Sequence, residues 1–294
     1  MDRYLRQAAR TTTTGGNVDS WACVTGASDG IGLGFAEELP SRGFNVILHG
    51  RNKEKLQKLQ TTLEAQFPAR QFQILVIDAS NRDSWSAAMN NFVSEFDKSN
   101  ARLTVLINNV GGGVSGHYLF EPMAKRTPQA VQAMIDVNTT FPALFTHSLL
   151  PLLIRSQPSL ILSLGSAASV FPPPYLGLYA GSKAFILAWS ESLAREMELE
   201  GIDIEVKGIM LARVQSAVNR GRVFDKFSVP TGRVFACATL NKVGSGALVV
   251  TPYWAHALQM LFIKITPTWI LSKMINTGTA EEMRWERREE QDQH

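Results

Sequence analysis

Cysteine is scarce in this chain of 294 residues, which contains Cys23 and Cys237 and no others. The two lie far apart in sequence, and Cys23 falls within a short apolar run that is typical of a core strand. We therefore expect both to be reduced packing residues. The five histidines show no metal-ligand spacing with one another or with cysteine, so we expect no metal site.

A large excess of one charge is also missing, since 29 basic and 26 acidic residues leave a formal net charge of +3. The sequence has no stripe of lysine and arginine with interleaved aromatic residues. These absences argue against nucleic acid as a partner. Internal repeats and low-complexity linkers are absent as well. Because 294 residues is close to the upper size for one hydrophobic core, a single large domain is the simplest interpretation.

Neither end of the chain contains an uninterrupted membrane-spanning run. Residues 1–20 lack the apolar core of a signal peptide and predict a flexible N-terminal arm. The stretch from Trp254 to Ile275 is apolar nearly all round, but Lys264, Pro267 and Lys273 are among the residues that interrupt it. The wall of an apolar substrate pocket, a subunit interface and a peripheral membrane contact through 254–275 remain open for this segment. The charged residues 281–294 predict a solvated, frayed end.

From Trp21 onward, short β-branched apolar runs alternate with amphipathic helical patterns. The expected strands are Trp21–Thr25, Asn45–His49, Gln73–Asp78, Thr104–Asn108, Leu160–Leu164 and Glu205–Met210. Between them lie helices such as Lys53–Phe67, and a mostly helical stretch, Pro128–Ile154, that Pro142 and Pro151 should kink or bound. This alternation is typical of βαβ units. It predicts an α/β fold, namely a three-layer, doubly wound Rossmann fold with a central parallel sheet in a single domain.

We place a dinucleotide-binding and catalytic domain at 21–250, with a substrate-side segment at 212–246 where the regular alternation stops. A C-terminal apolar segment and charged tail follow at 251–294. The substrate-side segment is basic, with one acidic residue, Asp225, among Arg213, Arg220, Arg222, Lys226, Arg233 and Lys242. These cations can meet a phosphorylated handle such as coenzyme A, or they can form a solvated or internally paired loop.

A glycine-rich turn follows the first expected strand and opens a helix. Its glycines permit a tight turn and close backbone approach, and the helix N-terminus offers N–H groups and a positive dipole end to a pyrophosphate. A purely structural turn is the alternative when the motif is taken alone. The expected cofactor-binding residues here are Gly26, Ser28, Asp29, Gly30, Ile31 and Gly32.

The end of the second expected strand favours NADP over NAD. A dinucleotide fold that prefers NAD usually presents an acidic residue there to the ribose 2′-hydroxyl. Gly50 takes that place in this chain, and Arg51 after it can form charge-assisted bonds to a 2′-phosphate. A solvated loop position is the alternative for Arg51. We therefore expect NADP, in its reduced form NADPH, to be the cofactor.

Two further strand ends supply candidates for the cofactor site. Asp78 closes the third expected strand, where its carboxylate can accept a hydrogen bond from the adenine amino group. Asn108, Asn109 and Gly111 close the fourth, where they can tie strands together and shape the floor of the cofactor site. For these residues a supporting role and a binding role coincide.

Tyr179 and Lys183 lie one helical turn apart, with Ser166 thirteen positions before Tyr179. A phenol has a pKa of about 10, and a lysine at i+4 shares its helix face. Lowering the phenol pKa by about three units would stabilise the phenolate by about 4 kcal/mol. Tyr179 could then pass a proton near neutral pH. This is chemistry that hydride transfer to or from a carbonyl requires.

These motifs resemble the short-chain dehydrogenase/reductase family from Trp21 to about Ile275. The residues that carry the resemblance, in the family's order and spacing, are Thr25-Gly26-x-x-x-Gly30-x-Gly32, Asn108-Asn109-Val110-Gly111, Asn138, Ser166 and Tyr179-x-x-x-Lys183. Within the family the chain looks most like the branch of very-long-chain 3-oxoacyl-CoA reductases and 17β-hydroxysteroid dehydrogenases. Members of that branch usually carry an N-terminal membrane anchor. This chain begins too close to Trp21 for one, so the resemblance leaves membrane residence open.

The resemblance implies a role for each catalytic candidate. Tyr179 would be the general acid, Ser166 would hold the carbonyl oxygen, and Lys183 would lower the Tyr179 pKa and hold the nicotinamide ribose. Asn138 would position a water that relays protons through Lys183. The loop after the sixth strand would contact the cofactor through Val214 and Ser216, although the family's proline is replaced in this loop, which reads Met210-Leu211-Ala212-Arg213-Val214-Gln215-Ser216.

The sequence as a whole predicts NADPH-dependent reduction of a ketone to a secondary alcohol. The partner would be a small lipophilic ketone, whether a 3-oxoacyl thioester, a keto-steroid or a polyketide-like compound. Two alternatives stay open: NADP-dependent alcohol oxidation at the same site, and a nucleotide-binding protein without redox turnover. We also expect a homo-oligomer in the cytoplasm, peripheral to the endoplasmic reticulum membrane.

Overall fold

The computed structural model describes residues 3–6, 20–99, 101–114, 119–216 and 227–292. Within them, seven strands form one sheet in the order β3-β2-β1-β4-β5-β6-β7, and every neighbouring pair is parallel. The strands are β1 Ser20–Val24, β2 Asn45–Gly50, β3 Phe72–Val76, β4 Arg102–Asn108, β5 Ser159–Leu164, β6 Ile204–Ile209 and β7 Val249–Val250. The predicted three-layer, doubly wound parallel fold is confirmed.

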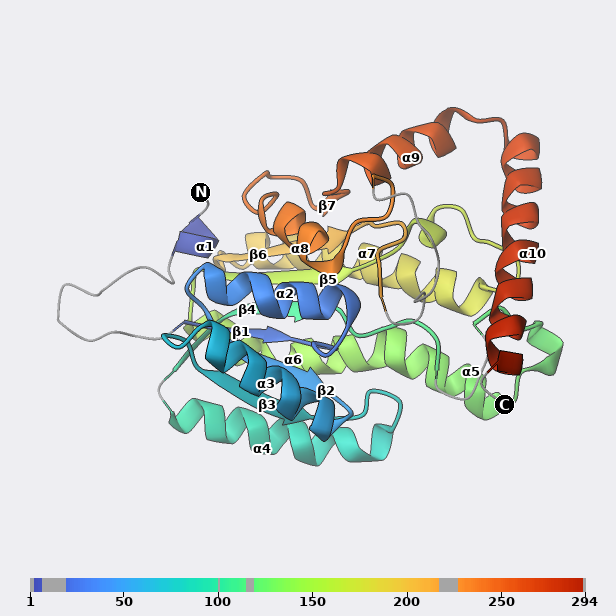
Figure 1. The fold of residues 1–294 in the computed structure, drawn as a ribbon. Helices are drawn as coiled ribbons and strands as arrows, with labels where there is room; N and C mark the ends of the chain where they lie inside the picture. The colour runs from blue at the N-terminus through green and yellow to red at the C-terminus, as the bar shows by residue number, and fades with distance from the viewer. Residues whose placement is uncertain (1–2, 7–19, 100, 115–118, 217–226, 293–294) are drawn as a thin grey trace.

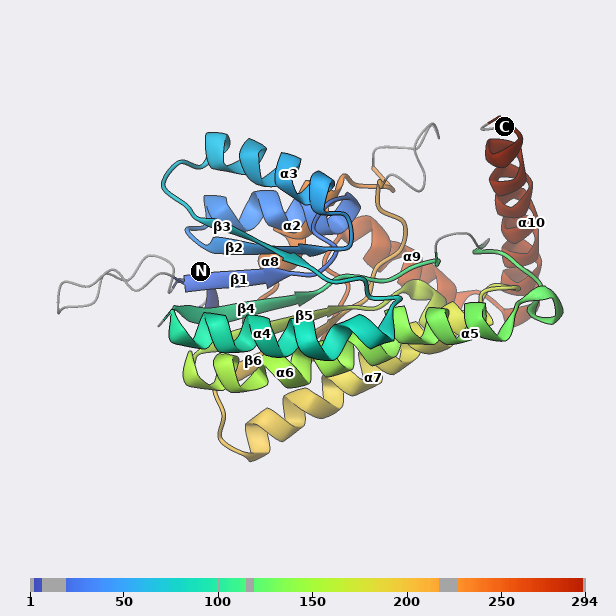
Figure 2. The ribbon, with the colours of Figure 1, turned by 90° about the horizontal axis from the view of Figure 1, so that it is seen from below.

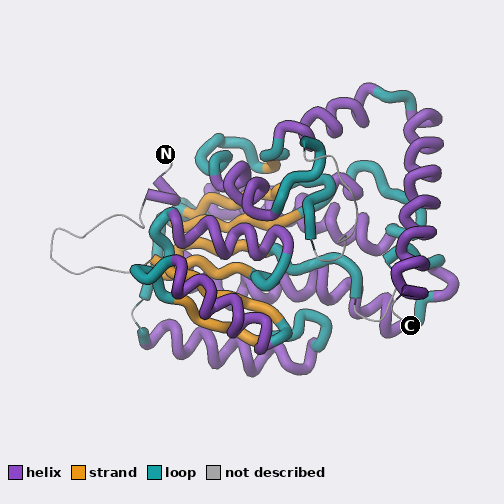
Figure 3. Tube along the Cα trace, in the orientation of Figure 1, coloured by secondary structure: helices purple, strands orange, loops and turns teal. Residues whose placement is uncertain are grey.

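Helices cover both faces of this sheet (Figure 1). Figure 2 shows α2 Gly30–Ser41, α3 Lys53–Gln66 and α8 Gly232–Leu240 on one side, and α4 Trp85–Lys98, α6 Phe141–Arg155 and α7 Gly177–Leu199 on the other. The remaining α-helices are α1 Arg3–Arg6, α5 Pro128–Ile135, α9 Trp254–Ile265 and α10 Thr268–Asp292. Figure 3 shows α9 and α10 extending beyond the sheet and its covering helices.

Side-chain caps explain where several helices begin. An N-terminal cap residue satisfies one of the backbone N–H groups that have no acceptor within the helix. Asp29, Asn52, Thr127 and Thr231 each accept such a bond, at the starts of α2, α3, α5 and α8. Two of these helices, α2 and α8, border the candidate site.

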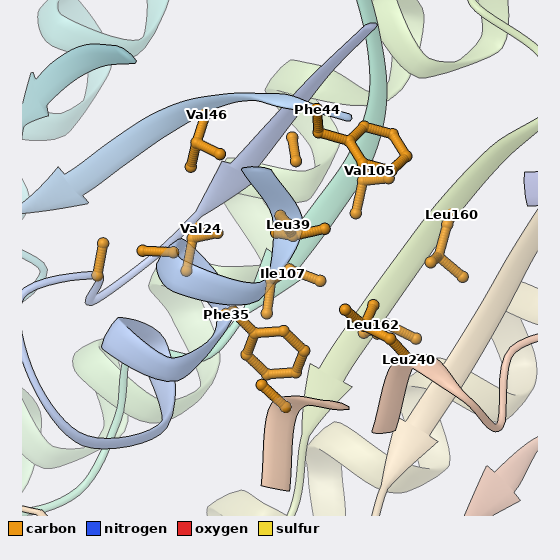
Figure 4. Close-up of a cluster of buried hydrophobic side chains, with 14 of the residues drawn as sticks. Val24, Phe35, Leu39, Phe44, Val46, Val105, Ile107, Leu160, Leu162 and Leu240 are labelled. Atoms are coloured by element: carbon orange, nitrogen blue, oxygen red, sulfur yellow. The ribbon is translucent and has the colours of Figure 1, made fainter. Parts of the chain in front are cut away.

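A separate apolar core fills each side of the sheet. Figure 4 shows the first, in which Phe35 and Leu39 of α2 pack against Val24, Ile107 and Leu162 of the strands. The second core joins the opposite sheet face to aromatic and aliphatic residues of α4, α6 and α7 that include Phe92, Phe145 and Leu193. Because both faces are covered, the central strands are mostly apolar on both sides, and this is why they occur in the sequence as short apolar runs.

The chain order reverses between β1 and β4. β1 pairs with β2 on one side and with β4 on the other. In open α/β sheets a ligand binds at such a switch point, beyond the carboxyl ends of the strands. The glycine-rich turn after β1 and the Asn109 loop after β4 therefore meet at the position that a dinucleotide requires.

The long apolar stretch after Pro128 is a nearly continuous helix. A π-helical turn, Asp136–Thr140, joins α5 to α6, and Pro151 is accommodated within α6. Pro142 is the second residue of α6 and directly follows the π-helical turn, so it accompanies a local irregularity of the helix and does not end the stretch. Residues 128–155 are long and apolar enough to cross a membrane, but half of the most apolar window is buried within this molecule. The helix is apolar because it covers the sheet.

Both ends of the chain differ from expectation. Leu5 of α1 is buried in the first core, and the Tyr4 hydroxyl donates to Asp203 at 3.0 Å. The predicted flexible arm is therefore wrong for residues 3–6, whereas residues 7–19 lie outside the described part. At the other end, α10 continues as a helix to Asp292, so the predicted frayed tail is wrong as far as that residue.

Candidate active site

The glycine-rich turn is held to β4 by a network around Thr25. Its Oγ1 donates to the Ile107 carbonyl at 3.1 Å and accepts from the Asn109 and Val110 N–H groups at 2.9 and 3.0 Å. The Asn109 side chain donates to the Thr25 carbonyl at 2.8 Å. A Cβ on Gly32 would lie 2.1 Å from the Gly26 carbonyl oxygen, so the turn and the helix can pack this closely only with glycine.

The start of α2 has the features of an anion site. Gly26 and Gly30 have φ angles of +66° and +55° and so bring the backbone around the turn. Asp29 caps the helix, with its carboxylate accepting from Gly30 N–H at 2.7 Å. Ser28, Gly30 and Ile31 are partly exposed at this corner. The N–H groups of a first helical turn and the helix dipole attract phosphate, so this corner fits a pyrophosphate.

His49, at the end of β2, is a supporting residue that the sequence analysis missed. Its Nδ1 accepts from Gly26 N–H at 3.3 Å, and its carbonyl accepts from Ala27 N–H at 2.9 Å. The ring is buried and lies 5.2 and 5.6 Å from the rings of Phe141 and Phe145. Burial lowers the pKa of His49 to about 4, against opposing effects of the Ile77 backbone and the Asp78 carboxylate. The ring is therefore neutral and can act as an acceptor.

The residues after β2 and β3 occupy the expected edge of the sheet. Gly50 is the last, buried residue of β2, and Arg51 follows it in an exposed position. Asn52 then caps α3, its Oδ1 accepting from Lys55 N–H at 2.9 Å. Asp78 holds its own turn, accepting from the N–H and the hydroxyl of Ser80 at 2.9 and 2.7 Å. A cation and a carboxylate therefore flank the β2 end of the candidate cofactor site.

The two asparagines after β4 differ in role. Asn109 contacts the glycine-rich turn, as described above. Asn108 is buried, and its Nδ2 donates to Thr146 Oγ1 at 2.8 Å and to Ser163 Oγ at 3.3 Å. The expectation that these residues tie elements together is met for both, and the contacts of Asn108 lie within the core and not at the turn.

The Ser166 and Tyr179 side chains converge above β5. Ser166 follows the strand and caps a short 3₁₀ turn, its Oγ accepting from Ala168 N–H at 3.2 Å. Tyr179 lies in the first turns of α7 and is hydrogen-bonded to the Ser166 side chain. Lys183, one helical turn later, is buried and donates to the Leu164 carbonyl at 2.9 Å. Its Nζ lies 5.7 Å from the centroid of the Tyr179 ring.

The pKa values correct one expectation. Burial raises the pKa of Tyr179 above its ordinary value, and the hydrogen bond to Ser166 opposes that shift. The expected depression by Lys183 is not found, because Nζ is directed at the Leu164 carbonyl and burial itself lowers the pKa of Lys183 to about 8. The phenol therefore keeps its proton at neutral pH, which suits a proton donor, while the lysine remains largely charged.

Asn138 lies in the π-helical turn and faces the same site. Its Oδ1 accepts from Gly112 N–H at 2.8 Å, and its Nδ2 donates to the Gly112 and Met134 carbonyls at 3.0 and 2.9 Å. A Cβ on Gly111 would lie 2.8 Å from Asn138 Oδ1 and 2.9 Å from Lys183 Nζ. The loop after β4, the π-helical turn and α7 therefore meet at Gly111.

The loop after β6 approaches the glycine-rich turn. A Cβ on Gly30 would lie 3.0 Å from the Ser216 Cβ, so Ser216 borders the candidate phosphate corner. Val214 is buried in the first core, and its side chain serves packing. The backbones of α2 and α8 also touch, since a Cβ on Gly34 would lie 2.1 Å from the Gly232 carbonyl carbon. The contact was not predicted from the sequence, because Gly34 and Gly232 were its only signal there.

The basic residues of the substrate-side segment are partly accounted for. Arg213 pairs with Glu282 of α10 at 2.6 Å, and Arg233 lies 3.8 Å from Glu38 of α2. Lys242 is exposed, whereas Arg220, Arg222, Lys226 and the acidic Asp225 lie outside the described residues. Among the described residues no group of three or more His, Cys, Asp or Glu could hold a metal ion.

The family model described as short chain dehydrogenase matches residues 20–225. The chain belongs to the short-chain dehydrogenase family. Very-long-chain 3-oxoacyl-CoA reductases of Scheffersomyces stipitis and Kluyveromyces lactis are each 35% identical to this short-chain dehydrogenase. The first match covers 94% of this chain and 80% of the relative, and the second covers 88% and 74%. The predicted resemblance to that branch is confirmed, and with it the assignment to the oxidoreductases.

Solved structures agree with the fold. A short-chain dehydrogenase from Sphingobium yanoikuyae in complex with NADPH superposes with a TM-score of 0.66 at 24% identity, covering 86% of this chain and 95% of that one. A metagenomic short-chain oxidoreductase in complex with NADP gives 0.63 at 25% identity, covering 79% and 96%. Both share the architecture of this short-chain dehydrogenase.

Proposed function

We propose that this short-chain dehydrogenase reduces a ketone on a lipophilic substrate, with NADPH as the hydride donor and Tyr179 as the general acid. The observation that carries the proposal is the convergence of Ser166, Tyr179, Lys183 and Asn138 beside the loop after β4, which also holds the glycine-rich turn through Asn109. A hydrogen-bonded hydroxyl, a proton-bearing phenol and a buried ammonium form a proton-donating site.

The residues present fit a dinucleotide. The partly exposed corner at the N-terminus of α2 would hold the pyrophosphate, with Ser216 at its border. Lys183 would bind the nicotinamide ribose, and Asp78 the adenine. Arg51 supports NADP over NAD, because the position before it is Gly50 and no carboxylate there would repel a 2′-phosphate. Solved relatives carry NADPH or NADP in their complexes.

The chain's own residues would control the proton. NADPH, when bound, supplies the hydride that reduces the carbonyl carbon. Tyr179 gives its phenolic proton to the carbonyl oxygen, which becomes the hydroxyl of a secondary alcohol. Ser166 donates a hydrogen bond to the same oxygen as negative charge develops on it. Lys183 would hold the nicotinamide ribose beside that phenol, and Asn138, which is tied to Gly112, supports the path by which the proton returns.

We infer that a 3-oxoacyl thioester is the preferred substrate class. The curated relatives are named as very-long-chain 3-oxoacyl-CoA reductases and match most of this chain. A keto-steroid or a polyketide-like ketone is the second candidate, since the fold of 7β-hydroxysteroid dehydrogenase also superposes, with a TM-score of 0.73. The reverse reaction, alcohol oxidation with NADP⁺, uses the same groups. The expected homo-oligomer and the expected cytoplasmic location beside the endoplasmic reticulum stay predictions.

The test is NADPH oxidation by the purified protein with three substrates: a long-chain 3-oxoacyl-CoA, a keto-steroid and an aromatic polyketide ketone. We expect turnover with the thioester to be fastest. Initial rates with NADP⁺ and the matching 3-hydroxyacyl-CoA separate reduction from oxidation. Absence of NADPH consumption across all three ketones, with NADPH binding intact, would favour the non-redox nucleotide-binding alternative.

A further inference from the structure

Four large apolar side chains form an exposed stripe along α9. Trp254, Leu258, Leu261 and Ile265 are 60%, 59%, 54% and 71% exposed. Their spacing of four, three and four residues places them on one narrow face of the helix. The opposite face of α9 is buried through Ala255, His256 and Met260. The α9 stripe is therefore a second apolar face, in addition to the face that the fold uses.

The apolar surface continues past the end of α9. Trp269, in the first turn of α10, is 73% exposed, and Phe262 and Met274 are 46% and 50% exposed. Apolar residues that occur singly on a surface need no explanation, but a run of this length marks a binding surface. Both helices extend beyond the sheet (Figure 1).

We propose that the α9 stripe and Trp269 form a docking surface for an anionic lipid bilayer. Residues 251–280 contain no Asp or Glu, whereas Lys264 and Lys273 are exposed beside the apolar residues. A helix with an apolar face and adjacent lysines lies in the interface of a bilayer. Tryptophan is favoured there, because its ring has an apolar body and a polar N–H. Lysines next to the surface attract anionic headgroups.

A second copy of this chain is the competing occupant. A two-fold contact places the same patch on both subunits. Across such a contact Lys264 and Lys273 would meet residues of the same patch, and residues 251–280 contain no carboxylate to pair with them. Like charges across an interface are unfavourable. The charge pattern therefore favours an anionic bilayer over self-association.

The docking surface is joined to the candidate active site through the buried face of α9. The Tyr253 hydroxyl, just before the helix, donates to the Phe227 carbonyl at 2.9 Å. His256 Nε2 lies 3.0 Å from the Arg213 carbonyl oxygen, and the Arg213 side chain pairs with Glu282 of α10. The docking helices thus hold the backbone that leads to Ser216. Docking would place this side of the site at the bilayer, where a lipophilic substrate resides, although the docking itself does not depend on the proposed activity.

The experiment is flotation of the full chain with vesicles of roughly one part phosphatidylserine to two parts phosphatidylcholine. Leu258→Glu combined with Leu261→Glu should lower the vesicle-bound fraction by about tenfold or more. Leu199→Glu is the matched control, since Leu199 is 86% exposed at the end of α7, outside the α9 stripe. We expect the control to bind like the parent. Circular dichroism and the thermal midpoint should be unchanged in both variants.

A second variant tests the charge argument. Lys264→Glu combined with Lys273→Glu should weaken binding to the anionic vesicles and leave the weaker binding to pure phosphatidylcholine vesicles nearly unchanged. Three outcomes would overturn the proposal. In the first, the parent protein fails to float with anionic vesicles. In the second, the leucine double variant floats as well as the parent. In the third, neither protein binds vesicles, and light scattering shows that the parent is a dimer and the leucine double variant a monomer.

Discussion

The buried ring of His49 makes the stability of the fold sensitive to mild acid. Its pKa is about 4 in the folded chain, against 6.5 ordinarily. Between these values the unfolded chain binds a proton that the folded chain does not. The stability that depends on the neutral ring is therefore fully present above about pH 6.5 and is lost as the pH falls toward 4. At 1.36 kcal/mol for each pKa unit, the full loss is about 3 kcal/mol.

Substitution His49→Asn isolates this effect. The asparagine Oδ1 can accept from Gly26 N–H in place of Nδ1, but it does not titrate. The free energy of unfolding, measured by urea denaturation at about pH 7.5 and about pH 4.5, should fall by about 2–3 kcal/mol more in the parent than in the variant. The other titrating groups are present in both proteins and cancel in this difference. At neutral pH the variant should be less stable, because the smaller side chain leaves space beside Phe141 and Phe145.

If the free energy of unfolding fell by the same amount in the parent and in the variant between those pH values, the reasoning would be refuted. Such a result would mean that His49 is protonated in the folded chain or that acid already opens its pocket. The proton NMR signal of the ring, followed through the same pH range, distinguishes these cases.

Three further predictions concern the cofactor site and the helices beside it. Arg51→Ala should weaken NADPH binding by about tenfold to a hundredfold and NADH binding far less, by calorimetry; equal losses would count against a 2′-phosphate contact. Gly34→Ala should destabilise the chain by about 1–3 kcal/mol or more, because the new methyl group meets the Gly232 backbone. Gly278→Ala is the control, and since there is open space around Gly278 it should be neutral or slightly stabilising. Similar thermal midpoints for the two variants would contradict the α2–α8 contact. Because the pKa of Lys183 is about 8, kcat/KM for reduction should fall as the pH rises through that value, and a profile that stays flat to about pH 10 would show that its charge is not needed.

The fold could be predicted because its signal is local. Alternation of apolar runs with helical patterns located six of the seven strands to within two residues at each end. β7 was not predicted, because Val249–Val250 is too short to form a pattern and depends on pairing with β6. The tail was interpreted as frayed from its mixed charge, but helix α10 continues through it. Mixed charge is compatible with a helix whose charged residues face water.

The candidate site was predictable where a motif fixes it and not where tertiary contacts do. The turn at Gly26, the Tyr179 and Lys183 pair, and Ser166 could be located because their motifs occur together in the order and spacing of the family that the sequence resembles. The support from His49 could not, because its contact with Gly26 joins the ends of two strands across the sheet. The direction of the Tyr179 pKa was also wrong, since burial cannot be judged from a spacing of four residues.

The central claim is that the Tyr179 phenol donates the proton in ketone reduction. Removing the hydroxyl by Tyr179→Phe keeps the ring and the helix, so NADPH binding should be retained. Turnover of a long-chain 3-oxoacyl-CoA, followed by NADPH absorbance, should fall by about a hundredfold or more. Turnover equal to that of the parent, at matched NADPH saturation, would contradict the account.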